Sequence, residues 1–302
     1  MKIAITGGSG LLGRQCAQDL LVHHQVSCFQ RNASEIGDIK AYALDVNEVS
    51  EIQKLLRGFD LVIHMAAKVS FHKKDEIAMY KTNVQGTQNV VNACIANGIP
   101  KFILISSTAA LDSAKNPMEI TEKNLWDRAS EKTSYAITKY LAELEAWRGQ
   151  EEGLQVATVC PGVIIGDGSD SQSSNQLYDV VRKKWSVYPS GRNGFINATE
   201  VSKIIGLIIE KEAYGKRYLA VTHNISYKEL LQLLADKLKL KAPQYPLKGA
   251  LLYVAIGMAK TLEFFGLKSP LPSQGLRNTN KNIKYLPQNI YTELEYQNGP
   301  LI

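Results

Sequence analysis

A tyrosine and a lysine lie four residues apart in the stretch "TSYAITKYLAE", which covers residues 133–143 and has the pattern of a helix. Four residues make about one helical turn, so the side chains of Tyr135 and Lys139 would leave the same face and could act on one molecule. Chance predicts about one such pair in a chain of this composition, so a tyrosine packed inward beside a solvated lysine explains the pair equally well. A chemical role therefore depends on the rest of the chain.

A glycine-rich turn lies near the N-terminus, where the run "TGGSGLLG" (residues 6–13) directly follows the apolar run "KIAIT". Gly7 and Gly10 would allow a tight turn and a close approach of the backbone to a pyrophosphate at the positive N-terminus of the next helix. Gly13 would let that helix pack closely against the strand. The spacing G-x-x-G-x-x-G differs from the common G-x-G-x-x-G pattern, but the strand–turn–helix context favours a dinucleotide site over a turn without ligand.

The end of the second apolar run, "VSCFQ", bears on the choice of cofactor. Where NAD-binding proteins place an acidic residue against the ribose 2′-hydroxyl, the chain has Gln30 and Arg31. A neutral side chain followed by a guanidinium suits a 2′-phosphate, so the sequence predicts NADP(H); a surface arginine without a ligand is the alternative. Asp45, in "LDV" after the third run, is placed either to meet the adenine or to close a turn.

The elements that must position these residues alternate along the first half of the chain. Short apolar runs are separated by segments of helical period; the runs are "KIAIT", "VSCFQ", "AYALDV", "LVIHMAA", "FILISS" and "VATVCPG". Apolar strands that alternate with helices predict a parallel sheet covered on both faces. The expected fold class is therefore α/β, with a Rossmann-type doubly wound sheet.

The pattern loosens after about residue 165, where a polar loop, "GDGSDSQSSNQ", precedes expected helices near 200–212, 226–239 and 248–266. In doubly wound folds ligands bind beyond the carboxyl ends of the strands, so these late elements would roof a pocket there. We expect residues 1–165 to form the dinucleotide-binding domain that carries the catalytic residues. Residues 166–302 would form a smaller, mainly helical substrate-binding region, intertwined with the first.

Composition and charge argue against several other classes of protein. Cysteines 16, 28, 94 and 160 lie in apolar surroundings without C-x-x-C spacing, so we expect buried thiols and neither a metal site nor a disulfide. The formal net charge of +6 is scattered, and its densest run, "RKK" at 182–184, is short, so we expect no nucleic-acid partner.

No segment has the pattern of a signal peptide or a membrane span. The N-terminal "MKIAIT" enters a strand pattern directly, which favours a cytoplasmic location. The apolar stretch 251–267 is too short to span a bilayer and carries Lys260 and Glu263. We interpret it as a pocket or packing helix, with contact to a membrane surface as the alternative.

The order of the motifs resembles that of the extended short-chain dehydrogenase/reductases. The resemblance covers the whole chain, is most specific over residues 1–170, and is carried by "TGGSGLLG", "HMAAKVS", "NVQGTQNVVNAC", "ISST", "YAITK" and "CPGVIIGDG". Within that superfamily the chain looks most like the branch of 3β-hydroxysteroid dehydrogenases and dihydroflavonol reductases, which includes bacterial reductases of long-chain keto acids. The segment "YPSGRNGFINATEVSKIIGLIIE" and the late apolar helix carry this finer resemblance.

The resemblance assigns roles to the tyrosine and the lysine. It implies that Tyr135 is the proton donor or acceptor, and that Lys139 binds the nicotinamide ribose hydroxyls while its charge lowers the pKa of the tyrosine. A cation is needed because an unperturbed phenol, with a pKa near 10, is a poor base at neutral pH. A third group, a hydroxyl that hydrogen-bonds the reacting carbonyl, aligns with Thr108, with Ser107 as the alternative. Asn83 aligns with an asparagine in the helix beneath the site.

The same resemblance implies a cofactor site built from the glycine-rich turn, the ends of the following strands and the loop beside the nicotinamide. The cofactor is expected to be NADP(H), with NAD(H) as the alternative. The residues expected to contact it are Gly7, Ser9, Gly10, Leu11, Leu12, Arg31, Asp45, Val46, Ala66, Ala67, Lys68, Tyr135, Lys139, Pro161 and Val163.

Two departures from the family pattern bear on the substrate. Nucleotide-sugar epimerases and dehydratases of the superfamily typically carry an "RDYIHV"-like segment that helps to hold the diphosphate, whereas this chain has "NGFINATEV" at 193–201. Cys160 takes the place of the arginine often found before the "PG" loop, which leaves the geometry on the substrate side open.

The sequence therefore predicts an NADP-dependent oxidoreductase that interconverts a ketone and a secondary alcohol on an apolar small molecule, such as a steroid-like, flavonoid-like or long-chain keto compound. One alternative is a nucleotide-sugar epimerase or dehydratase that retains NAD. A second is a nucleotide-sensing module without turnover, although such modules tend to lose the tyrosine and the lysine. Whether the chain forms a homodimer is left open.

Overall fold

The computed structural model describes residues 1–32, 37–111, 118–124, 126, 132–166, 172–264 and 273–302. Its central element is a seven-stranded sheet of order β11-β7-β5-β4-β1-β2-β3, in which every neighbouring pair of strands runs parallel. The strands are β1 (Lys2–Thr6), β2 (Gln25–Gln30), β3 (Lys40–Ala43), β4 (Leu61–His64), β5 (Lys101–Ile105), β7 (Gln155–Pro161) and β11 (Lys216–Ala220). All strands but β11 coincide with the expected apolar runs, so the α/β fold with a parallel sheet is confirmed.

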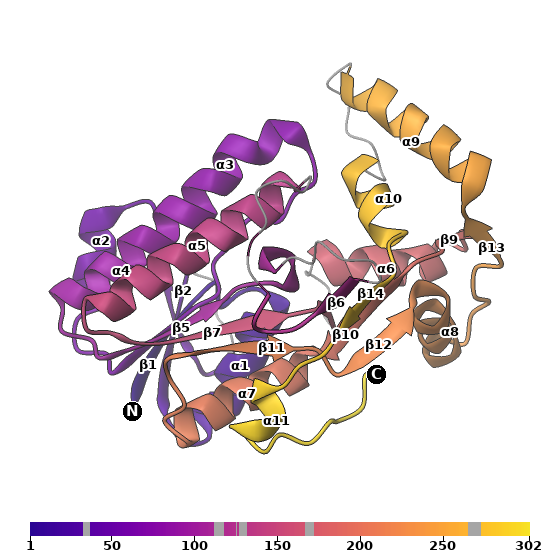
Figure 1. Cartoon of the computed structure of the whole chain (residues 1–302). Helices are drawn as coiled ribbons and strands as arrows, with labels where there is room; N and C mark the ends of the chain where they lie inside the picture. Colours follow the sequence, from indigo (N-terminus) through magenta and orange to yellow (C-terminus); the bar gives the residue numbers. More distant parts are fainter. Residues whose placement is uncertain (33–36, 112–117, 125, 127–131, 167–171, 265–272) are drawn as a thin grey trace.

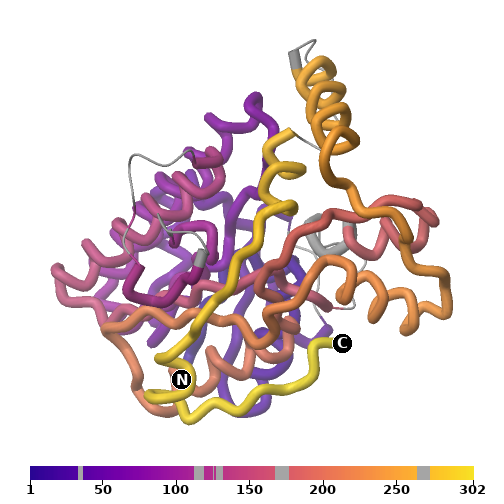
Figure 2. Tube along the Cα trace, turned by 45° about the vertical axis from the view of Figure 1, so that its right-hand side comes forward, coloured from indigo at the N-terminus to yellow at the C-terminus, as the bar shows by residue number. Residues whose placement is uncertain are grey.

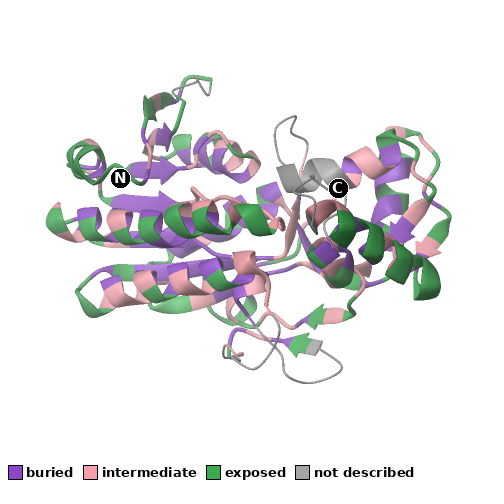
Figure 3. Cartoon of the chain, turned by 90° about the horizontal axis from the view of Figure 1, so that it is seen from above, coloured by how far each residue is buried: buried purple, intermediate pink, exposed green. Residues whose placement is uncertain are grey.

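Helices cover both faces of this sheet, and in Figures 1 and 3 a layer of buried strands lies between two layers of helices with exposed outer sides. On one face α1 (Leu11–Leu21) packs against α7 (Ala198–Glu210). On the other face α4 (Gly86–Ala96) contacts both α2 (Val49–Leu55) and α5 (Ser134–Glu151).

Both faces of each central strand are apolar. In β1, Ile3 and Ile5 belong to the core on the α1 side, whereas Ala4 between them belongs to the core on the α4 side. In β4, Ile63 and Val62 divide in the same way. A strand buried on both faces needs a continuous apolar run, which is the pattern of these segments in the sequence.

The order of the sheet reverses between β1 and β4. From β1 the chain moves outward through β2 to β3 and then crosses back to β4, on the other side of β1. In open α/β sheets a ligand crevice forms outside the carboxyl ends of the strands at such a point. The glycine-rich turn follows β1, and residues 65–68 follow β4, so both border this crevice. Short helical segments complete this half of the chain: η1 (Lys73–Asp75), α3 (Glu76–Tyr80), the π-helical turn η2 (Lys81–Gln85) and η3 (Thr108–Ala110).

The smaller, mainly helical region after residue 165 is also confirmed. Its further helices are α6 (Gln172–Arg182), α8 (Tyr227–Leu238), α9 (Gly249–Phe264), α10 (Ser273–Thr279) and α11 (Asn289–Thr292). Short strands tie them together: β12 (His223–Ser226), β10 (Arg192–Asn197) and β8 (Val163–Ile165) form one sheet, while β13 (Tyr245–Leu247) pairs with β9 (Val187–Pro189) and β14 (Ile283–Tyr285) with β6 (Met118–Ile120).

Three features of this region differ from the expectation. The helix expected near 200–212, α7, does not roof a pocket, because its apolar face is buried against α1 and the sheet. The strand β11 was not expected and completes the central sheet beside β7. The run expected to be a polar loop already enters α6 at Gln172, while residues 167–171 of that run lie outside the described residues.

The helix α9 stands out from the body of the molecule in Figures 1 and 2. Ile256 and Ala259 face a small apolar cluster that includes Leu276 of α10. Tyr253 and Met258 are instead exposed. In the part of the chain that the structure describes, no helix is long and apolar enough to cross a membrane. The interpretation of 251–267 as a pocket or packing helix, against a contact with a membrane surface, stays a prediction, and 265–267 lie outside the described residues.

Candidate active site

A cavity of about 1400 Å³ opens at the carboxyl ends of the central strands. A pocket for one small ligand measures roughly 300–1,000 Å³, so this cavity has room for a dinucleotide and a second molecule. It is lined by Thr108 and by all the residues expected to contact the cofactor, which are Gly7, Ser9, Gly10, Leu11, Leu12, Arg31, Asp45, Val46, Ala66, Ala67, Lys68, Tyr135, Lys139, Pro161 and Val163.

The glycine-rich turn has no room for side chains. Gly7 has a φ of +77°, and a Cβ atom there would lie 2.8 Å from the backbone nitrogen of Ala66. A Cβ atom on Gly13 would lie 2.3 Å from the carbonyl oxygen of Gly7. The turn is closed by a hydrogen bond from the Gly10 amide to the Gly7 carbonyl (3.1 Å), and α1 begins at Leu11. These contacts bring the N-terminus of α1 to the cavity wall, where backbone amides can meet an anion.

The end of β2 presents one buried and one exposed polar side chain. Gln30 is buried and Arg31 is exposed, and both line the cavity. Asp45 closes a turn, because its Oδ1 accepts hydrogen bonds from the backbone amide (2.9 Å) and the side-chain amide (2.7 Å) of Asn47. A second arginine, Arg14, also lines the cavity and donates from Nε to the Ser9 carbonyl (2.9 Å). Arg14 was missed from the sequence, although its place one residue after Gly13 puts it on the first turn of the helix beside the expected phosphate site.

Asn83 fixes the loop that follows β4. Its Oδ1 accepts from the Lys68 amide (2.7 Å), and its Nδ2 donates to the Lys68 carbonyl (3.0 Å) and to the Thr138 hydroxyl (3.0 Å). One buried amide therefore connects the segment 66–68 to α5 beneath the cavity. Lys68 also forms an ion pair with Asp75 (Nζ to Oδ1, 3.0 Å).

Tyr135 and Lys139 lie on the first turns of α5, which begins after Thr133, whose hydroxyl accepts from the Ala136 amide (3.1 Å). Lys139 is 5% exposed, and its Nζ donates to the Ile105 carbonyl (2.8 Å). The alternative of a solvated lysine is therefore wrong. Burial lowers the pKa of Lys139 to about 8, and the charge of Glu143 opposes this shift.

The expected effect of the lysine on the tyrosine is not found. Burial raises the pKa of Tyr135 to about 12, and the group that opposes this shift is the Ser107 hydroxyl, through a hydrogen bond. Desolvation of the phenolate outweighs the other contributions. The phenol is consequently protonated at neutral pH and can act as a proton donor.

The two candidate hydroxyls have different partners. Ser107 hydrogen-bonds Tyr135, and its Oγ also accepts from the Ala109 amide (3.1 Å). Thr108 lies in the same cavity wall but hydrogen-bonds the phenol of Tyr285. The choice of Thr108 over Ser107 stays a prediction, and the structure gives Ser107 the direct contact with the tyrosine.

Tyr285 belongs to a group of lining residues that were missed from the sequence. It comes from β14, while Asn193 and Tyr227 come from β10 and α8 and share a hydrogen bond (3.1 Å). Apolar groups from the same half of the chain complete this wall: Leu177, Trp185, Tyr188, Leu247 and Leu276. No motif marks these residues, because pairings between distant segments bring them to the cavity.

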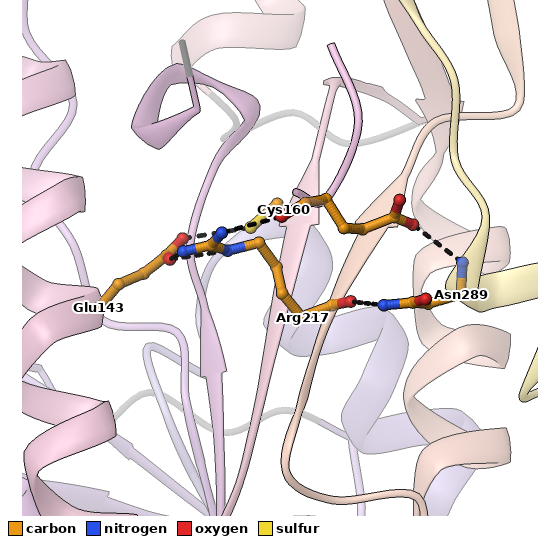
Figure 4. Close-up of polar contacts among 5 residues, drawn as sticks. Glu143, Cys160, Arg217 and Asn289 are labelled. Carbon is orange, nitrogen blue, oxygen red and sulfur yellow. Dashed lines mark hydrogen bonds and ion pairs between the residues drawn. The ribbon is translucent and has the colours of Figure 1, made fainter. Parts of the chain in front are cut away.

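The four cysteines are buried and free, as expected. Cys160 also has a polar contact, since its thiol donates to Oε1 of Glu143 (3.2 Å), which in turn pairs with Arg217 (Figure 4). Among the described residues, no group of three or more His, Cys, Asp and Glu side chains is arranged to hold a metal ion.

The sequence and the fold are both similar to those of known enzymes. Residues 3–217 match the sequence model of the NAD dependent epimerase/dehydratase family. An anthocyanidin reductase of Arabidopsis thaliana is 28% identical over 238 residues, which are 71% of this chain and 69% of the relative. A putative dihydroflavonol 4-reductase of Synechocystis sp. is 25% identical over 296 residues, 93% of this chain and 85% of the relative. A solved nucleoside-diphosphate-sugar epimerase from Pseudomonas aeruginosa shares the fold, with a TM-score of 0.79 and 21% identity over 99% of this chain and 93% of that chain.

Proposed function

Because the chain belongs to the NAD dependent epimerase/dehydratase family, we propose that it is an NADP-dependent oxidoreductase that interconverts a ketone and a secondary alcohol on a small molecule. The observation that carries the proposal is one cavity wall in which a protonated tyrosine, a buried lysine and a hydroxyl lie together beside the glycine-rich turn. The similarity to an anthocyanidin reductase and to a putative dihydroflavonol 4-reductase supports a reductase.

The residues present fit a dinucleotide. A Cβ atom at Gly7 or Gly13 would collide with the backbone of Ala66 or of Gly7, so both glycines are needed for the tight turn that brings the N-terminus of α1 to the cavity. In this proposal the N-terminus of α1 holds the pyrophosphate, Arg31 pairs with the 2′-phosphate, and Lys139 binds the nicotinamide ribose. When bound, NADPH supplies a hydride for the carbonyl carbon.

The chain itself supplies the proton and the polarisation. Tyr135 donates its phenol proton to the carbonyl oxygen, which completes the alcohol, and the reverse transfer applies to oxidation. A hydroxyl, from Thr108 or Ser107, donates a hydrogen bond to the same oxygen. The ammonium of Lys139 would hold the nicotinamide ribose hydroxyls by hydrogen bonds, so the charged form of the lysine is the one that the proposal requires.

The proposed substrate is apolar over most of its surface. The far wall of the cavity is formed by leucines and aromatic side chains, which suits a steroid-like, flavonoid-like or long-chain keto compound. Lys132, Lys183 and Lys281 line the cavity as well, so an acidic group on the substrate is compatible with the site. The segment 193–201, which replaces the diphosphate-binding motif, contains no arginine, and this argues against a nucleotide sugar.

The proposal is tested by NADPH consumption with the purified protein against neutral and acidic ketones of steroidal, flavonoid and long-chain type. Turnover of at least one class, abolished in Tyr135→Phe, is the expected result. Conversion of a uridine or thymidine diphosphate sugar by protein that retains NAD would establish the epimerase or dehydratase instead. Nucleotide binding without turnover of any compound would favour the sensing module.

A further inference from the structure

Glu143 follows Lys139 by one helical turn, just as Lys139 follows Tyr135, so the three side chains share one face of α5. Glu143 is only 1% exposed. A buried carboxylate is costly unless hydrogen bonds and an opposite charge compensate its loss of water. Among the described residues that line the cavity Glu143 is absent, so the proposed substrate does not explain its presence.

The carboxylate is held by side chains of β7 and β11 (Figure 4). Its Oε2 accepts from Arg217 Nε (3.0 Å) and Nη2 (2.5 Å), while its Oε1 accepts from the Cys160 thiol (3.2 Å). Arg217 is itself fixed, because Nη1 donates to the Glu122 carbonyl (3.1 Å) and its own carbonyl accepts from Asn289 (2.7 Å). Strands β7 and β11 thus fix the orientation of a charge that belongs to α5.

The surroundings of Lys139 contain few other ionisable groups. On α5 itself Tyr135 and Glu143 share its face, and the packed elements add Cys160 on β7, His64 on β4, Cys94 on α4 and Lys101 on β5, which pairs with Glu212. The exposed side chains of Glu76, Tyr80 and Lys81 lie on α3 and η2. Burial raises the pKa values of Tyr135, Cys94 and Cys160 and lowers that of His64 to about 3, so these four are neutral near pH 7. Arg217 and Glu122 lie beyond Glu143.

We propose that Glu143 is a positioning residue that keeps Lys139 protonated as its buried counter-charge, and that Arg217 fixes the carboxylate for this task. The inference rests on the proposed function, in which the charged form of Lys139 is the active one. Glu143 acts through Lys139 and touches neither substrate nor cofactor.

The direction of the expected change in the pH profile follows from the pKa of Lys139. The pKa of Lys139 is about 8, so kcat/KM of ketone reduction is high below this pH and is lost as the pH rises through it. Removal of the negative charge in Glu143→Gln lowers the pKa of Lys139. The alkaline limb of the pH profile of kcat/KM therefore moves to lower pH by about half a unit to one unit. Glu143→Asp keeps the charge and keeps the limb within about 0.3 units of the wild-type position.

The control is Glu145→Gln, on the same helix, whose carboxylate pairs with Arg148 (2.9 Å) on the outer side. It should leave the limb unmoved. An unmoved limb in Glu143→Gln would overturn the proposal, and so would equal downward shifts in Glu143→Gln and Glu143→Asp, since they would indicate a packing role for the side chain. If Glu143→Gln does not fold, as judged by circular dichroism, Glu143→Asp decides: a downward shift of about half a unit or more in this variant, which keeps the charge, overturns the proposal.

A second readout needs no turnover. Competitive acetylation followed by mass spectrometry measures the pKa of each lysine from the pH dependence of its reactivity, and the cavity gives a small reagent access to Lys139. The pKa of Lys139 should fall in Glu143→Gln, with Lys139 of the wild type as reference. A wild type that reduces no ketone would refute the proposed function, whereas an unchanged Lys139 pKa would refute the role of Glu143.

Discussion

At the scale of single residues, burial decides which groups of the site carry a proton. The pKa of Tyr135 is raised to about 12, so the phenol is protonated, and that of Lys139 is lowered only to about 8, so the amine is charged at neutral pH. The same pair of states is what proton donation to a ketone requires. The spacing of Tyr135 and Lys139 was readable from the sequence, but the burial of the lysine was not, because it depends on β5 and β7 packing against α5.

Replacing Tyr135 by Phe should lower turnover by a factor on the order of hundreds or more, because only the proton donor is removed. NADPH affinity, measured by fluorescence titration, should change little. Tyr140→Phe is the matched control, since Tyr140 lies on the same helix and the substitution keeps the ring that stacks on Trp126. Turnover that survives within a few-fold in Tyr135→Phe would show that another group delivers the proton.

The adjacent hydroxyls can be separated by three substitutions. If Thr108 polarises the carbonyl, Thr108→Val should lower kcat by roughly a hundredfold and Thr108→Ser should keep most of it, because only the hydroxyl matters. Ser107→Ala should then be the milder change. The sequence could not decide between neighbours, since the direction of each hydroxyl is set by the tertiary partners Tyr135 and Tyr285.

An inactive Ser107→Ala with an active Thr108→Val would move the role to Ser107. Equal damage from Thr108→Val and Thr108→Ser would instead point to packing against Tyr285. Both outcomes are read from steady-state kinetics at saturating NADPH.

At the scale of elements, the proposed preference for NADPH depends on the carboxyl end of β2. Gln30 is buried where a carboxylate would repel a 2′-phosphate, and the exposed Arg31 lines the cavity one residue later. One charge-assisted contact contributes about 1.5 to 3 kcal/mol, so NADPH should be preferred over NADH by roughly ten- to a hundredfold in kcat/KM. The double change Gln30→Asp with Arg31→Ala should reverse the preference.

The preference should also shrink at high salt, because Arg31 is exposed. Arg57→Ala, at another exposed arginine, should leave it unchanged. A wild-type enzyme that uses NADPH and NADH equally would show that Arg31 makes no contact with the cofactor.

The elements also differ in how far the sequence predicts them. The long strands β1, β2, β4, β5 and β7 are continuous apolar runs between helices, and each follows from its own residues. The short strands cannot be predicted from their own residues in this way. The three residues of β6 and the three of β14 form strands only because they pair with each other, and they are 165 residues apart. The lining residue Tyr285 lies on β14, which explains why this part of the site was missed.

At the scale of the whole molecule, the C-terminal segment forms part of the cavity wall on the proposed substrate side. In Figure 2 it runs from α10 across the molecule towards α11. Glu122, which follows β6, is 7% exposed, and its Oε1 accepts from the amides of Gln288 (2.9 Å) and Asn289 (3.0 Å). One buried carboxylate therefore fixes the segment that leaves Tyr285 in the cavity wall.

Glu122→Ala should lower the free energy of unfolding by about 1 to 3 kcal/mol, because it removes a buried carboxylate that accepts from two part-buried backbone amides. It should also raise KM for the ketone while NADPH affinity stays within about twofold, since the cavity wall at the cofactor end does not involve β14. Glu119→Ala is the control, because Glu119 forms an exposed pair with Lys284 (3.2 Å) that contributes at most about 1 kcal/mol. Equal urea midpoints for the two variants would contradict the role of Glu122.

The pairing of β6 with β14 has a consequence for the order of folding during synthesis. Met118 leaves the ribosome long before its partner Ile283, and at about 5–20 residues per second the delay is on the order of ten seconds. Strands β1 to β7 of the dinucleotide-binding half have been synthesised by then, so this half can fold first. The substrate-binding half can complete its folding only after the last residues of the chain have been synthesised. A nascent chain that ends before β14 would therefore be able to bind the cofactor but not to discriminate between substrates.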